Sequence, residues 1–158
     1  MNWQQVLEDK SLQDLPYKIE LNAAGQIVMS PAKNKHSFMQ GTIHTLLVRM
    51  ASSGCVMPEI AIVTSENVKV ADVAWASDER SAVVKDQDAC SIAPELCVEV
   101  QSPGNADSEM QHKVSLYLAA GAIESWICNE SGNVRFFDAS GELNASKLFP
   151  SFPTKITL

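Results

Sequence analysis

Three charged residues in the middle of the chain have types and surroundings suited to hydrolytic chemistry. They are Asp72 in KVADVAW, Glu99 in LCVEVQSP and Lys113 in EMQHKVSLY. Two carboxylates can hold a hard divalent cation, because such ions prefer oxygen ligands. A nearby ammonium can orient an attacking water or offset charge that develops on an anionic substrate. If the three side chains converge, metal-assisted hydrolysis is the chemistry they favour.

Each of these residues also has a purely structural explanation. Asp72 could simply end a turn after Val70. Glu99 lies among strand residues, where an ionised carboxylate must be paired, ligated or exposed, and an edge strand with one wet face would expose it. Lys113 stands four residues after Glu109, a spacing at which an exposed helical ion pair contributes about 0.2–0.5 kcal/mol. The choice between these readings depends on the elements that carry the three residues.

The segment before Asp72 predicts a hairpin followed by a helix. YKIEL and QIVMS, within residues 16–32, are typical of two short strands, joined by a turn that contains Asn22 and Gly25. Pro31 ends the second strand. Residues 36–50 place apolar side chains at close to helical spacing, and Gly54 follows as a stop.

The segments that carry Asp72, Glu99 and Lys113 predict strands and a second helix. Residues 59–77 are rich in Ile and Val and favour two or three strands, with a turn near residues 65–67. Residues 94–102 alternate, so Leu96, Val98 and Val100 share one face while Glu99 lies on the other, with Cys97 and Gln101. Residues 107–122 predict a helix that begins at an Asp or Ser N-cap and ends at Gly121.

The remaining residues predict a sheet that continues past this helix. Residues 122–142 indicate strand, turn, strand and a further turn at Ser140–Gly141, and LFPSFPTKITL at the end predicts a last short packed element. The fold class is therefore α/β, in the sense of an α+β mixed sheet flanked by helices, with residues 94–102 central. Residues 1–158 are expected to form one domain.

Charge and composition limit the classes of function. The chain has 12 basic and 19 acidic residues, a net charge of −7, and the acidic excess lies between residues 61 and 110. Such a chain is a poor non-specific binder of nucleic acid. Residues 78–88, DERSAVVKDQD, are expected to form a solvated acidic loop. The four cysteines and three histidines lack metal-ligand spacing, which favours reduced, buried thiols. With no signal peptide and no membrane span indicated, we expect a cytoplasmic location.

The order of several motifs resembles a known family, the Uma-type restriction-endonuclease-like proteins of the PD-(D/E)XK nuclease superfamily. ADVAW is followed by PELCVEVQSP, a polar gap and KVSLYLAAGAIESWI. IELNAAGQIVMSPA resembles the family's opening hairpin, HSFMQGTIHTLLVRM its His-led helix, and SKLFPSFPTKITL its closing segment. The resemblance spans residues 17–158 and implies a restriction-endonuclease-like core with an N-terminal β-hairpin.

The resemblance also implies roles for individual residues. Asp72 and Glu99 would ligate Mg²⁺ or Mn²⁺, with the backbone carbonyl of Val100 as a further ligand. Members of the superfamily usually have a lysine two residues after the acidic ligand, but this chain has Gln101 at that position. The Gln101 side chain could still contact the phosphate or a metal-bound water. Lys113, on the following helix, matches the position to which the family moves that lysine. A small residue, Ala71, replaces the proline that commonly precedes the aspartate.

Two further residues are candidate neighbours of the site. His36 matches the family's helix histidine, although a local hydrogen bond at the helix start would also explain it. Glu20 lies in the hairpin, where an acidic residue recurs in the family. The resemblance implies a DNA endonuclease that acts on duplex DNA as a homodimer, in which Lys33, Lys35 and Arg49 could contribute to a basic groove. A nuclease-fold binding or assembly module without catalysis, and a hydrolase of a smaller phosphodiester, are the alternatives.

Overall fold

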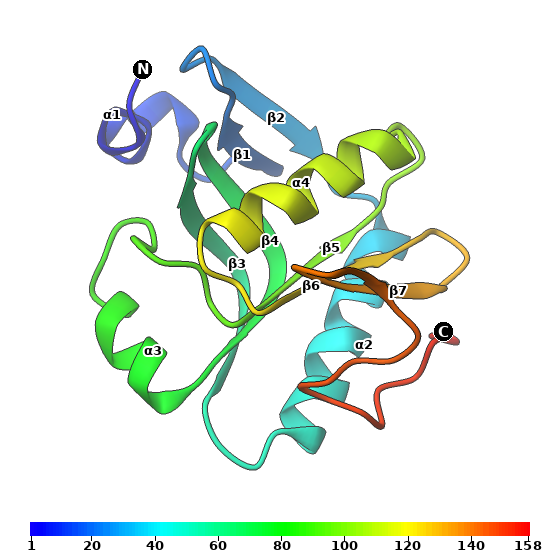
Figure 1. Cartoon of the computed structure of the whole chain (residues 1–158). Helices are drawn as coiled ribbons and strands as arrows, with labels where there is room; N and C mark the ends of the chain where they lie inside the picture. Colours follow the sequence, from blue (N-terminus) through cyan, green and yellow to red (C-terminus); the bar gives the residue numbers. More distant parts are fainter.

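The computed structural model describes residues 1–158 and consists of a six-stranded sheet, a separate two-stranded hairpin and flanking helices, whose arrangement can be followed in Figure 1. The first half of the chain forms α1 (Trp3–Glu8), a short 3₁₀ helix (Lys10–Leu12), β1 (Tyr17–Leu21), β2 (Ile27–Pro31), α2 (Asn34–Met50), β3 (Cys55–Thr64) and β4 (Asn67–Ala76). The second half forms α3 (Asp78–Val84), β5 (Leu96–Val100), α4 (Asp107–Ala119), β6 (Glu124–Cys128), β7 (Val134–Asp138) and β8 (Gly141–Leu143).

The large sheet is mixed, as the sequence predicts. Its strand order is β3-β4-β5-β6-β7-β8, and only β5 and β6 are parallel. A parallel pair needs a crossover connection, and α4 provides it. The prediction that residues 94–102 are central is confirmed, because β5 has a hydrogen-bonded neighbour on each side. The predicted hairpin is confirmed as the two-stranded sheet β1-β2.

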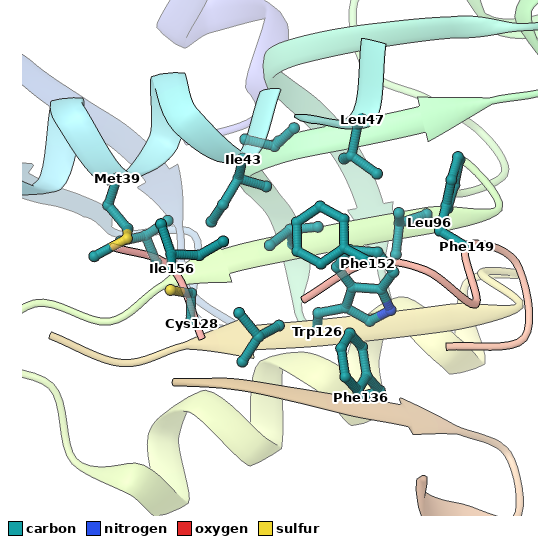
Figure 2. Close-up of a cluster of buried hydrophobic side chains, with 14 residues drawn as sticks. Met39, Ile43, Leu47, Leu96, Trp126, Cys128, Phe136, Phe149, Phe152 and Ile156 are labelled. Carbon is teal, nitrogen blue, oxygen red and sulfur yellow. The ribbon is translucent and has the colours of Figure 1, made fainter. Parts of the chain in front are cut away.

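The period-2 alternation of β5 assigns its side chains to two different layers. Leu96, Val98 and Val100 pack in the cluster that α2 covers, whereas Cys97 packs on the opposite face with Tyr117 of α4. Figure 2 shows α2 above the sheet and α4 below it. Glu99 therefore belongs to the face that α4 covers, and the explanation of an edge strand with a wet face is wrong.

The larger core lies between α2, the sheet and the C-terminal segment (Figure 2). Trp126 of β6 is fully buried at its centre, and Phe136 approaches its ring edge-on with the ring centroids 5.0 Å apart. Phe149 and Phe152 of the C-terminal segment contact the same indole, which confirms that this segment packs against the domain. The core members are Met39, Ile43, Leu47, Val73, Leu96, Val98, Val100, Trp126, Cys128, Val134, Phe136, Phe149, Phe152 and Ile156.

The acidic segment at residues 78–88 is not the solvated loop that the sequence predicts, because its first part forms α3. The Ser77 side chain accepts a hydrogen bond from the Arg80 amide, as an N-cap does. Asp78 and Glu79 occupy the first helical turn, where the positive end of the helix dipole favours carboxylates. The acidic residues thus help to start a short helix.

Three smaller expectations also differ from the structure. The N-terminal residues form α1, which is capped by a capping box at Asn2 and which the sequence reading does not include. Helix α4 has Ala106 at its N-cap without a side-chain hydrogen bond, so Asp107 lies in the first turn and is not the cap. Cys55 is exposed, whereas the other three cysteines are buried and none forms a disulfide. None of the helices is long and apolar enough to cross a membrane.

Candidate functional site

The hairpin brings two charged side chains against the large sheet. Glu20 of β1 accepts a hydrogen bond from the Val70 amide of β4 at 2.8 Å, and the Lys69 ammonium donates to the Leu21 carbonyl at 2.9 Å. Lys18 lies two residues before Glu20, so both side chains leave β1 on the same face. The docked hairpin thus directs Lys18 and Glu20 towards β4 and β5.

Asp72 and Glu99 lie side by side where the pairing of β4 and β5 ends. The last residues paired between these antiparallel strands are Val73 and Val98, and Asp72 directly precedes Val73 while Glu99 directly follows Val98. Asp72 Oδ2 accepts a hydrogen bond from the Val100 amide at 2.7 Å, so a side chain satisfies the backbone where the strands separate. Both carboxylates are almost completely buried, with 1% of each residue exposed.

Lys18 holds the two carboxylates together. Its Nζ lies 3.0 Å from Asp72 Oδ1, 3.2 Å from Glu99 Oε2 and 3.0 Å from the Val70 carbonyl oxygen. The sequence analysis does not identify Lys18 as a site residue. The available signal is its position two residues before Glu20, on the same face of a strand that docks beside Asp72.

Lys113 reaches the same cluster from α4. Its Nζ lies 2.8 Å from Glu20 Oε1 and 3.5 Å from Glu99 Oε2, and the side chain is buried. The explanation of Lys113 as an exposed partner of Glu109 is therefore wrong, since its ion pairs are with β1 and β5. Tyr117, one helical turn further on, donates its hydroxyl to Glu99 Oε1 at 2.5 Å and is a second residue that the sequence analysis does not identify.

The environment shifts the pKa values of the three carboxyl groups in different directions. Burial raises the pKa of Glu99, and the attraction of Lys113 and Lys18 does not fully offset this effect. Burial also disfavours ionisation of Asp72, but Lys18, His36 and the Val100 amide outweigh it and lower the pKa of this carboxyl. Glu20 has a lowered pKa because Lys113 and Lys18 outweigh its burial. Glu99 is thus the carboxyl that takes up a proton most readily.

His36 contacts the charged cluster, and its side chain does not make the local hydrogen bond at the helix start that is the other explanation for it. Its Nε2 is 3.4 Å from Asp72 Oδ2, and this contact raises the pKa of the imidazole. The other ring nitrogen, Nδ1, is buried without a hydrogen-bond partner. Gln40, one turn later on α2, donates to the Asp72 carbonyl at 2.9 Å. The start of α2 therefore fixes both the backbone and the carboxylate of Asp72.

Gln101 is the one candidate catalytic residue that lies apart from the others. Strand β5 ends at Val100, so the alternation that would place Gln101 beside Glu99 does not continue. The Gln101 side chain donates to the Asn105 carbonyl at 3.0 Å and thereby closes the loop before α4. It does not line the cleft that holds Asp72, Glu99 and Lys113.

The charged cluster forms the floor of a cleft of about 360 Å³ between the hairpin, β4, β5 and α4. No group of three or more His, Cys, Asp or Glu side chains is arranged to hold a metal ion. Three oxygens nevertheless surround the Lys18 ammonium: Asp72 Oδ1, Glu99 Oε2 and the Val70 carbonyl oxygen. The ammonium occupies the position that a metal cation could take. Val100 also lines the cleft. This donor set fits an ion such as Mg²⁺ that keeps several of its waters.

Comparisons with known proteins agree with the fold. Residues 7–151 match the model of the family Uma2, described as "Putative restriction endonuclease". A solved structure from Anabaena variabilis ATCC 29413, described as "a putative nuclease belonging to DUF820", is similar with a TM-score of 0.67 and 15% sequence identity. The similarity covers 98% of this chain and 83% of the other. A search of curated proteins finds no match.

Proposed function

Because this chain belongs to the Uma2 family of restriction-endonuclease-like proteins, we propose that it is a divalent-metal-dependent endonuclease that hydrolyses phosphodiester bonds in duplex DNA. The observation that carries this proposal is the convergence of Asp72, Glu99 and Lys113, from three different elements, on the floor of one cleft. Two carboxylates beside a lysine can hold a metal ion and offset charge on a phosphate, as metal-assisted phosphodiester hydrolysis uses them.

In this proposal Asp72 and Glu99 hold Mg²⁺ or Mn²⁺, with the Val100 carbonyl as a further ligand. When bound, such an ion supplies Lewis-acid activation of the phosphate and a more acidic water. The chain itself orients the two carboxylates, since the Val100 amide binds Asp72 and the Tyr117 hydroxyl binds Glu99. Lys113 keeps a positive charge beside Glu99, where it offsets negative charge that an incoming phosphate brings.

Exposed lysines near the cleft support the proposed substrate and assembly. Lys33 and Lys35 are exposed and line a small hollow that shares His36 and Val100 with the cleft. They supply positive charge at the mouth of the site in a chain of net charge −7. A homodimer would combine two such mouths, together with Arg49 of α2, into one groove for duplex DNA. We propose this arrangement for a protein that acts in the cytoplasm.

Cleavage of a supercoiled plasmid in the presence of Mn²⁺ tests the function. The wild type should convert the plasmid to nicked and linear forms, and EDTA should stop the reaction. Asp72→Asn, Glu99→Gln and Lys113→Met should each lower the rate by about a hundredfold or more. Glu79→Gln and Lys85→Met on or next to α3 make matched changes in charge outside the cleft and should leave the rate unchanged. Undiminished cleavage by the three site variants would contradict the proposal.

The alternative of an inactive binding module has one specific observation in its favour. Lys18 already occupies the position between the two carboxylates and offsets part of their charge, and Gln101 replaces the usual strand lysine and lies outside the cleft. A module of this kind would bind DNA in a gel-shift assay with no dependence on divalent cations and would never cleave it. Saturable binding without cleavage in Mg²⁺ and in Mn²⁺ would favour this alternative.

A further inference from the structure

Lys18 lies at the position between Asp72 and Glu99 where the two carboxylates could share a cation. Its ammonium contacts one oxygen of each carboxylate, at 3.0 and 3.2 Å. The second oxygen of each carboxylate has another partner. Asp72 Oδ2 accepts from the Val100 amide, and Glu99 Oε1 accepts from the Tyr117 hydroxyl. A cation shared by the two carboxylates would therefore bind Asp72 Oδ1 and Glu99 Oε2, the two oxygens that Lys18 contacts.

An ion cannot join these two oxygens while the Lys18 ammonium remains between them. Divalent Mg²⁺ requires oxygen ligands at about 2.1 Å, whereas the ammonium is already in hydrogen-bond contact with both oxygens. The ion and the ammonium would overlap, and their like charges would repel. Binding of the ion thus requires the ammonium to leave.

The surroundings of Lys18 allow this movement without unfolding. The side chain lines the cleft and is 14% exposed, and its flexible four-carbon stem allows the ammonium to change position. Glu20, on the same strand, keeps its contacts with Lys113 and the Val70 amide, so the hairpin stays docked. The ammonium can therefore turn into the cleft, where an anionic substrate would lie.

We propose that Lys18 is a resident cation of the site, which partly offsets the charge of Asp72 and Glu99 in the metal-free chain and exchanges with the divalent ion when the ion binds. The proposal rests on the proposed function, because it assumes that these carboxylates are the metal ligands. It adds Lys18 as a positioning residue of the site. Lys18 keeps two adjacent buried carboxylates in place before the ion arrives, and this exchange weakens the apparent affinity for the metal.

Mn²⁺ binding to the metal-free protein tests the exchange, with unbound Mn²⁺ measured by electron paramagnetic resonance. Lys18→Met removes the competing charge and should lower the Kd for Mn²⁺ by about tenfold or more. Lys18→Arg keeps a competing cation and should bind no more tightly than wild type. Lys85→Met removes one positive charge outside the cleft and should stay within about twofold of wild type. An unchanged or higher Kd for folded Lys18→Met would overturn the proposal.

A measurement on the wild type covers the case in which Lys18→Met fails to fold. Acetylation of individual lysines, followed by mass spectrometry, should show Lys18 protected in the metal-free chain. Saturating Mg²⁺ should speed its acetylation by about fivefold or more relative to Lys85. If Mg²⁺ binds and the acetylation rate of Lys18 relative to Lys85 stays the same, the exchange is refuted.

These outcomes separate the inference from the proposed function. Tighter Mn²⁺ binding by Lys18→Met, in a chain that cleaves no DNA, would support the exchange and contradict the endonuclease. Metal-dependent plasmid cleavage by the wild type, with Lys18→Met binding Mn²⁺ no more tightly, would support the endonuclease and contradict the exchange.

Discussion

The ion pair between Lys113 and Glu20 joins α4 to the hairpin, and its removal should destabilise the folded chain. Their charged atoms are 2.8 Å apart, and the side chains are only 11% and 7% exposed. Lys113→Met keeps most of the aliphatic stem but leaves Glu20 buried without its closest cation. Breaking one side of a buried pair costs roughly 3–5 kcal/mol. For a chain of this length, each kcal/mol lowers the Tm by about 2–4 °C, so a decrease of roughly 6–20 °C is expected.

Urea denaturation followed by tryptophan fluorescence measures this loss. In Lys113→Met the unpaired Glu20 carboxylate can escape its cost by taking up a proton, so the deficit should shrink as the pH falls. The double variant Glu20→Gln/Lys113→Met removes the unpaired charge and should recover part of the lost stability. A stability within about 0.5 kcal/mol of wild type at neutral pH would refute the reasoning. So would a deficit that is independent of pH, because lost packing alone would explain it.

Three further predictions concern buried or paired polar groups. Tyr117→Phe leaves Glu99 Oε1 without its hydroxyl donor and should cost about 1.5–3 kcal/mol in urea denaturation, whereas Tyr17→Phe, at an exposed tyrosine, should cost almost nothing. Glu124 accepts four hydrogen bonds, two of them from the Lys147 and Leu148 amides, so Glu124→Gln should cost about 2–4 kcal/mol and speed proteolysis of the C-terminal segment. Lys147 and Ser140 lower the pKa of Asp138 to about 2, so its contribution to stability is complete above an unfolded pKa of about 3.9 and is lost as the pH falls through 2. The difference between wild type and Asp138→Asn in urea midpoint should therefore disappear between pH 4 and pH 2, and a constant difference would contradict this assignment.

Local patterns in the sequence predict most of the fold. The alternation around Glu99 places it opposite Val98, and the apolar spacing after His36 predicts α2. Residues 78–88 show where this reading fails. Their charges suggest a solvated loop, but a Ser N-cap followed by two acidic residues is also a helix start, and here the helix forms. Charge alone cannot distinguish these outcomes, because both leave the carboxylates exposed to water.

The candidate site could be predicted only in part. Asp72, Glu99 and Lys113 are found because each lies in a motif on a predicted element, and the structure brings them together. Lys18 and Tyr117 are missed because nothing local to either residue indicates a buried carboxylate partner. Their roles depend on how the hairpin docks on β4 and how α4 crosses the sheet. Gln101 lies away from the cleft because β5 and its alternation end at Val100, one residue earlier than the sequence pattern suggests.

The Lys113–Glu20 pair also determines when this site can exist during synthesis of the chain. Lys18 and Glu20 leave the ribosome early, but their partners are 81 and 93 residues further along, in β5 and α4. Until those elements emerge, the hairpin can reach Asp72 of β4 but lacks Glu99 and Lys113. Contacts of such long range form late and together with the rest of the fold. A growing or truncated chain that stops before α4 therefore lacks Lys113, and the charged cluster is completed only when α4 has packed on the sheet.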